Sequence, residues 1–325
     1  MTKYFEAVPN FSEGRSAATI AAITEAARGV PGVAVLDVES NVDHNRSVIS
    51  LAGEGGALSE ALVRMVKVAI GRIDLNHHTG EHPRMGAADV VPFVPLGDAT
   101  MEEAIALAAR LGERLWSELH LPVYLYGNAA RRPERQDLAV VRKGGFEGIR
   151  ESIASDPTRR PDFGEAAVHP TAGIVAVGAR PVLIAFNAYL ASNDLAIAKK
   201  VAHAVRGRDG GLPEVKALGF DIKERNQVQV SMNLTDYRKT PIHQALEAVR
   251  REAGRQGVQV NESEIVGLVP EDALLDASEF YLQLHRFDRS TILERKVRGV
   301  LAPAAAAASS TFAASSLEGF AGLLA

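Results

Sequence analysis

The sequence predicts an α+β fold made of two halves in which the secondary-structure elements follow the same order. Apolar runs of strand length alternate with segments whose apolar residues recur at helical spacing. The order strand, helix, strand, strand, helix, strand occurs within residues 4–96 and again after residue 173. The chain has 325 residues, 46% of them hydrophobic and 23% charged, which is ordinary for two globular units. This repeated order is the split βαβ, or ferredoxin-like, arrangement, so we expect two βαββαβ subdomains with antiparallel sheets.

The first half begins with a short strand at 4–8 and an alanine-rich helix at 16–28 that ends near Gly29. Its other elements are strands at 33–38 and 47–52, a helix at 58–73 and a strand at 90–96. The helix at 58–73 is predicted because its apolar residues recur on one face. These residues are Leu58, Leu62, Met65, Val66 and Ala69.

The second half repeats this order. The stretches 174–176 and 182–186 are rich in strand-forming residues, and a helix at 194–205 can be capped by Ser192, Asn193 or Asp194. Strands at 217–222 and 228–234 flank a turn at 224–226. A helix then runs from Pro241 to Gly257, and a last strand covers 258–269.

A further helix at 101–120 and a strand at 122–126 follow the first half, and residues 128–173 are rich in arginine and glycine. This basic loop region has two interpretations: a solvated linker, or loops that draw anionic ligands toward a cleft. We therefore predict an N-terminal subdomain at 1–173, a C-terminal subdomain at 174–300 and an Ala/Ser-rich tail or linker at 301–325.

Composition and charge exclude several classes of function. The net charge of −4 provides no basic field for nucleic acid, and the absence of cysteine excludes disulfides and thiolate chemistry. The first residues carry no signal-peptide pattern, and no apolar run is long enough to span a bilayer. We expect a cytoplasmic protein with no membrane or nucleic-acid partner.

Residues 76–86 hold three histidines, a glutamate and an arginine in an irregular segment. We interpret His82 as a general acid and base, because an imidazole exchanges a proton near neutral pH. His77 and His78 are interpreted as bystanders. His78 and His82 have the spacing of metal ligands on a helix, but Gly80 and Pro83 disfavour a helix there. A metal-dependent hydrolase that uses these three histidines is kept as an alternative.

Two other polar clusters lie where strands are predicted to end. Residues 10–15 join the first strand to the first helix, and their N–H groups with Arg15 suit an anion, although Ser12 is also a natural helix cap. Glu39 and residues 43–46 lie at the turn between the next two strands. A simple hairpin turn and a functional role are equally consistent with that cluster.

A set of motifs in one order resembles the glutamate formimidoyltransferase family, whose members include the transferase half of formiminotransferase-cyclodeaminases. The resemblance covers roughly residues 3–287. The motifs lie at 8–14 (VPNFSEG), 45–46 (NR), 80–86 (GEHPRMG), 161–164 (PDFG), 178–187 (GARPVLIAFN), 229–234 (QVSMNL) and 264–270 (EIVGLVP).

The resemblance implies transfer of a formimino group from N-formimino-L-glutamate to N5 of tetrahydrofolate, the acceptor substrate, without a metal. It also implies two α/β subdomains with a ligand tunnel between them, a homodimer and a possible cyclodeaminase partner. Formyl transfer from N-formylglutamate on the same site is an alternative, because the same amine and histidine serve both donors.

The resemblance further implies roles for particular residues. His82 is the catalytic histidine, and Glu39, or Asp43 near it, is the acidic residue. Folate binding falls on Gly164, His169, Pro170, Thr171, Ala172 and Gly173, where the aromatic residue of animal members is missing. The expected substrate-binding residues are Asn10, Ser12, Arg15, Asn45, Arg46 and Arg180, whose arginines suit the carboxylates of the substrate.

Overall fold

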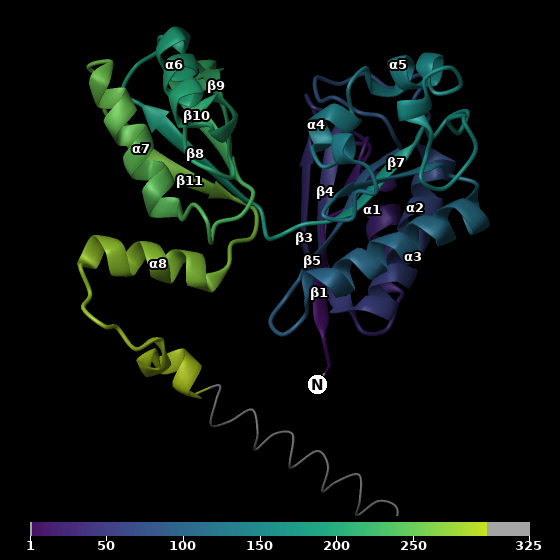
Figure 1. The fold of residues 1–325 in the computed structure, drawn as a ribbon, viewed down its shortest axis with the longest axis horizontal. Helices are drawn as coiled ribbons and strands as arrows, with labels where there is room; N and C mark the ends of the chain where they lie inside the picture. The colour runs from purple at the N-terminus through teal and green to yellow at the C-terminus, as the bar shows by residue number, and fades with distance from the viewer. Residues whose placement is uncertain (1, 298–325) are drawn as a thin grey trace, which may run out of the picture. The chain divides into compact units, whose positions relative to one another are not determined.

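The computed structural model describes residues 2–297, which contain a seven-stranded mixed sheet and a four-stranded antiparallel sheet (Figure 1). The chain divides into a compact unit that ends at Ala273 and a second unit that begins at Leu274. Within the described range, no helix has the length and apolar character needed to cross a membrane. The predicted tail at 301–325 lies outside the described residues.

The first sheet contains the predicted βαββαβ order. Its elements are β1 (Tyr4–Ala7), β2 (Asn10–Phe11), α1 (Ala17–Arg28), β3 (Val33–Asn41), β4 (Arg46–Glu54), α2 (Gly55–Arg72) and β5 (Ala88–Pro95). β1 and β2 both lie between β4 and β5, and β3 pairs with the other edge of β4. The interruption between β1 and β2 falls at Pro9, which has no N–H to donate to a neighbouring strand. The pairings among these strands are antiparallel, as predicted.

The prediction of a purely antiparallel first sheet is wrong, because β7 (Val175–Ala179) pairs in parallel with β5 and with β6 (Val123–Gly127). The helix α3 (Met101–Leu119) lies between β5 and β6 in the chain, as expected for a connection that returns the chain in the same direction. This part of the sheet has apolar side chains on both faces: Phe93 packs with the helices, and Val90 packs on the opposite side. The strand predicted at 174–176 therefore exists but belongs to the first sheet.

Residues 128–173 are not a plain linker. They contain the helices α4 (Leu138–Val141) and α5 (Gly145–Ser152) and the 3₁₀ turns η1 (Pro133–Arg135) and η2 (Pro157–Arg159). Val141, Ile149 and Ile153 are buried in a cluster on the face of the sheet opposite α3. Apolar residues recur at helical spacing within this arginine-rich segment, and the prediction did not take them into account.

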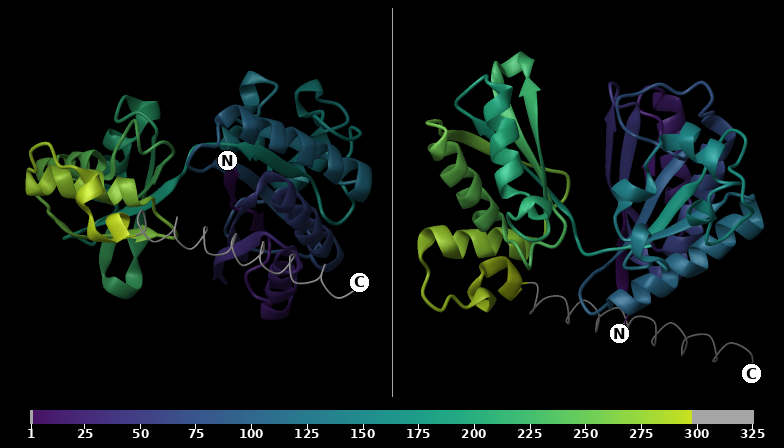
Figure 2. Two further views of the ribbon diagram at one scale, coloured as in Figure 1. Left: turned by 90° about the horizontal axis from the view of Figure 1, so that it is seen from below. Right: turned by 45° about the horizontal axis from the view of Figure 1, so that its top comes forward.

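The second sheet has the strand order β11-β8-β10-β9, which is the antiparallel ferredoxin-like arrangement that the sequence predicts. Its elements are β8 (Ile184–Leu190), α6 (Leu195–Val205), η3 (Gly207–Asp209), β9 (Val215–Ile222), η4 (Lys223–Arg225), β10 (Gln227–Leu234), α7 (Ile242–Arg255) and β11 (Val260–Val266). The helices α6 and α7 lie side by side against this sheet (Figure 2). Asp194 caps α6, as one of the three expected residues.

The chain continues into α8 (Glu271–Leu282) and the turn η5 (Arg289–Thr291). Arg289 holds this C-terminal segment together, because its guanidinium pairs with Glu279 at 2.6 Å and with Asp276 at 2.5 Å. These pairs are local contacts within the second unit.

Candidate active site

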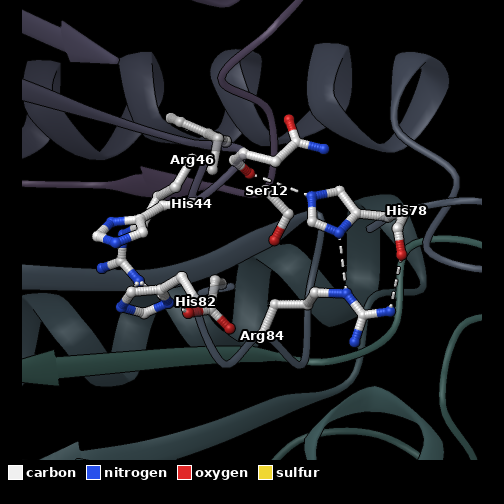
Figure 3. A pocket seen from close by; sticks show the side chains of 9 residues that line it. Ser12, His44, Arg46, His78, His82 and Arg84 are labelled. Atoms are coloured by element: carbon white, nitrogen blue, oxygen red, sulfur yellow. Dashed lines mark hydrogen bonds and ion pairs between the residues drawn. The ribbon is translucent and has the colours of Figure 1, made fainter. Parts of the chain in front are cut away.

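A small pocket in the first subdomain gathers side chains from β2, the β3–β4 turn, residues 78–84 and β5 (Figure 3). Its lining includes His82 and Arg46 together with His44, His78 and Arg84, all labelled in Figure 3. β2 lies between β4 and β5 and pairs with both of them, so the ends of these strands bring residues from distant parts of the sequence to one place.

Asn45 holds the turn between β3 and β4 against the histidine-rich segment. It has a positive φ of 48°, which asparagine tolerates better than most residues. Its side-chain oxygen accepts a hydrogen bond from Gly14 N at 2.9 Å, and its amide nitrogen donates to Thr79 O at 2.9 Å. A Cβ on Gly80 would lie 2.4 Å from His44 O, so only glycine fits where the two segments meet. These contacts fix the start of the loop that bears His82.

The chain that follows His82 is fixed from two sides. Ser12 donates its hydroxyl proton to Gly86 O at 2.7 Å, and Ser12 N donates to Ala87 O at 2.9 Å. On the other side, Ala87 N donates to Ala172 O at 2.9 Å, and Ile174 N donates to Met85 O at 3.0 Å. The loop is therefore held between β2 and the start of β7.

His82 is half-buried, with Nδ1 2.7 Å from Pro83 O and both ring nitrogens 2.7 Å from Arg46 Nη1. Because the Pro83 carbonyl can only accept, we assign the ring proton to Nδ1, which leaves Nε2 to accept from Arg46. Burial, and after it the positive charges of Arg46 and Arg142, lower the pKa of His82 to about 4. The imidazole is thus neutral near pH 7, with its basic lone pair on Nε2.

A group of buried charges lies behind this histidine. Asp89 on β5 is only 2% exposed, and its Oδ2 lies 2.6 Å from Arg142 Nη2 and 3.8 Å from Arg46 Nη1. Arg46 also donates to Asn10 Oδ1, and burial lowers the pKa of Arg46 to about 10. Asp89 is the carboxylate of this pocket, and sequence reasoning missed it. The available signal was an acidic residue within an otherwise apolar buried strand.

Neither of the two acidic residues that the sequence suggested lines the pocket. Glu39 is exposed on β3, where it pairs with Val48, and Asp43 is exposed in the turn that follows β3. The backbone of Asp43 nevertheless contacts the loop, since its carbonyl accepts from Glu81 N at 3.2 Å.

The other histidines differ in their environments. His77 is exposed, and its Nδ1 lies 3.1 Å from Asp74 Oδ2. His78 lines the pocket, whereas the sequence predicts a bystander. Its Nδ1 accepts from Arg84 Nε at 2.9 Å, and its Nε2 faces Asn45 O at 3.1 Å. Across residues 2–297, no three histidine, aspartate or glutamate side chains gather as a metal site would require.

The predicted substrate-binding residues fall into two groups. Ser12, Asn45 and Arg46 line the pocket, and Asn10 contacts Arg46. Arg15 and Arg180 do not line it: Arg15 donates to Val42 O at 3.0 Å, and Arg180 donates to Pro181 O at 2.9 Å.

The predicted folate-binding residues are also divided. Residues 169–173 form a turn in which His169 Nδ1 accepts from Ala172 N at 3.0 Å, and the end of this turn borders the chain after His82. Gly173 has a φ of 71°, and a Cβ there would lie 2.1 Å from Met85 O. Gly164 lies elsewhere, against Pro122 and Trp116 of α3.

Comparison with known proteins identifies the family of this chain. The family profile described as "Formiminotransferase domain, N-terminal subdomain" matches residues 4–180, and "Formiminotransferase domain" matches residues 185–311. A glutamate formimidoyltransferase of Thermoplasma acidophilum is 51% identical over 90% of this chain and 96% of its own length. One from Streptococcus pyogenes is 45% identical over 92% of this chain and 100% of its own. The formimidoyltransferase-cyclodeaminase of Mus musculus is 41% identical over 86% of this chain, which matches 53% of that longer protein. The chain therefore belongs to the formiminotransferase family.

Proposed function

We propose that this protein is a glutamate formimidoyltransferase that moves the formimino group from N-formimino-L-glutamate to N5 of tetrahydrofolate, with His82 as the general acid and base. The observation that carries the role of His82 is the position of its half-buried imidazole in the pocket, where Nε2 lies 2.7 Å from Arg46 Nη1. The lowered pKa of this imidazole supports a neutral ring that can accept a proton. The similarity to glutamate formimidoyltransferases over nine tenths of the chain supports the choice of reaction.

The reaction needs one proton to be removed and later returned. N5 of tetrahydrofolate attacks the formimino carbon, the new C–N bond forms, and the N5 proton passes to His82 Nε2. The tetrahedral intermediate then breaks its bond to the glutamate nitrogen, which takes the proton back from His82. The products are 5-formimidoyltetrahydrofolate and L-glutamate.

Arg46 links substrate binding to this proton transfer. In the structure its guanidinium occupies the edge of the imidazole, 2.7 Å from Nε2. A substrate carboxylate that pairs with Arg46 draws the guanidinium away and neutralises a charge that lowers the His82 pKa. Binding of the anionic substrate therefore exposes Nε2 of His82 and raises the His82 pKa.

Other site roles follow from the resemblance and complete the proposal. Asn10, Ser12, Arg15, Asn45 and Arg180 are assigned to substrate binding beside Arg46. Gly164 and residues 169–173 are assigned to folate, and Glu39 or Asp43 to the stabilisation of the amidinium. A homodimer, a tunnel between the subdomains and a cyclodeaminase partner are part of the same proposal.

A direct assay tests the reaction. The protein is mixed with tetrahydrofolate and formiminoglutamate, treated with acid, and examined for the absorbance of 5,10-methenyltetrahydrofolate. We expect absorbance with formiminoglutamate, and the same rate after exhaustive chelation. Absorbance only with N-formylglutamate would favour formyl transfer, and loss of activity on chelation would favour the metal-dependent alternative.

A further inference from the structure

We propose that the buried Asp89 and its half-buried partner Arg142 are positioning residues for His82, and that they change the basicity of its imidazole in opposite directions. The proposal rests on the proposed role of His82, but it can be measured without turnover. Neither residue is hydrogen-bonded to His82; both act on it through Arg46 and through their charge.

Asp89 contacts the chain just before its own strand and two arginines that are distant in the sequence. Its Oδ1 accepts a hydrogen bond from Met85 N at 2.8 Å, in the chain that follows His82. Its Oδ2 accepts from Arg142 Nη2 at 2.6 Å, and Arg46 Nη1 lies 3.8 Å away from the same oxygen. The side chains are 3% exposed for Asp89, 14% for Arg142 and 18% for Arg46, so water screens these charges poorly. Asp89 thus lies beside the same Arg46 nitrogen that contacts the imidazole.

The charges behind His82 do not cancel. Two guanidinium groups share one carboxylate, which leaves one positive charge beside a half-buried imidazole. The other groups around the ring are the Pro83 carbonyl at 2.7 Å and the His44 ring, whose centroid is 6.0 Å away. Further along the pocket, His78 binds Arg84, whose charge is paired with Glu147.

The signs of the two contributions differ. Arg142 and Arg46 lower the pKa of His82, whereas Asp89 raises it. Arg142 follows α4, in the arginine-rich region 128–173. One arginine of that region therefore belongs to the electrostatics of the proton-accepting site, in addition to any role in attracting anions. Arg142 Nε has no hydrogen-bond partner among the atoms described. The guanidinium therefore hydrogen-bonds Asp89 through Nη2 and not through Nε.

Histidine NMR titration tests this directly, with the His82 signal assigned from its loss in His82→Asn. We expect Arg142→Gln to raise the His82 pKa by on the order of half a pH unit, and Asp89→Asn to lower it. The double variant should titrate close to the wild type, because it removes one charge of each sign. Arg142→Lys is the matched control: it keeps the charge and should leave the titration nearly unchanged.

A pair with a merely structural role would give a different pattern. Arg142→Gln and Arg142→Lys would then lower the free energy of unfolding by similar amounts and leave the His82 pKa unchanged. That result would overturn the proposal. If Asp89→Asn does not fold, the two Arg142 variants still decide the matter. A His82 pKa that moves as expected in a protein without transferase activity would leave this proposal intact and refute the proposed function instead.

Discussion

Nη1 of Arg46 lies 2.7 Å from both ring nitrogens of His82, so a single guanidinium occupies the edge of the imidazole that carries these two nitrogens. In the proposed reaction this contact must open before Nε2 can accept a proton. We expect an anionic substrate that pairs with Arg46 to draw the guanidinium away from Nε2.

Replacing His82 removes the proposed general acid and base. We expect His82→Asn to lower turnover by about a hundredfold or more, because general acid–base catalysis contributes about that much. The variant should remain folded, since His82 lies in a loop and is only half-buried. His77→Asn is the matched control, because His77 is exposed in the same segment and should retain full activity. Equal activities in the two variants would refute the assignment.

The same histidine makes the stability depend on pH. Its pKa is lowered from 6.5 to about 4 in the folded protein, so the unfolded chain binds a proton that the folded protein does not bind in this range. The contribution is fully present above about 6.5 and is lost as the pH falls toward about 4. We expect the unfolding free energy, measured by urea titration at about pH 7 and about pH 5, to fall less in His82→Asn than in the wild type. An identical fall in both proteins would argue against the lowered pKa.

Gly173 is required where the turn at 169–173 meets the chain after His82. Its φ is 71°, and an added Cβ would lie 2.1 Å from Met85 O. We expect Gly173→Ala to cost more than about 2 kcal/mol of stability, as strain and clash add, and to reduce activity. Gly210→Ala is the control: its φ is 91° but its surroundings are open. That variant should lose only about 1 kcal/mol, and equal losses at the two sites would show that the contact with Met85 does not matter.

The aspartate of the P-D-F-G motif has a structural role. Asp162 accepts from Leu125 N at 2.7 Å and pairs with Arg135, which is 3% exposed and lies 4.5 Å from the centre of the Tyr124 ring. Removing one partner leaves a buried charge, so we expect Asp162→Ala to cost about 3–5 kcal/mol by urea unfolding. The double variant Arg135→Met/Asp162→Leu should recover much of the loss. A double variant as unstable as Asp162→Ala would contradict this explanation.

The antiparallel part of the fold could be predicted because local patterns determine it. Strands and helices of the βαββαβ order can be recognised from apolar spacing within each half, and both halves follow that order. The position of β7 could not be predicted in the same way, because an apolar run does not reveal its partner strands. The continuous apolar runs at β5, β6 and β7 did carry a signal, since strands buried on both faces are typical of parallel pairing.

Only some residues of the site could be predicted from the sequence, for a similar reason. His82 and Arg46 stand in motifs that suggest chemistry by themselves, and the structure brings them together. Asp89 stands in a strand, and its importance depends on Arg142, which comes from a helical segment far along the chain. The resemblance favoured Glu39 instead, and closeness in sequence added Asp43. Both side chains are exposed and do not line the pocket.

The hydrogen bonds between residues 85–87 and 172–174 have a consequence for how the protein is made. The histidine loop leaves the ribosome long before the chain that fixes it, so the loop can reach its final shape only after residue 174 has been synthesised. Closing such a distant contact is slow compared with forming the local helices. A shortened chain that ends before Ala172 would keep His82 but lack these bonds to the residues after it.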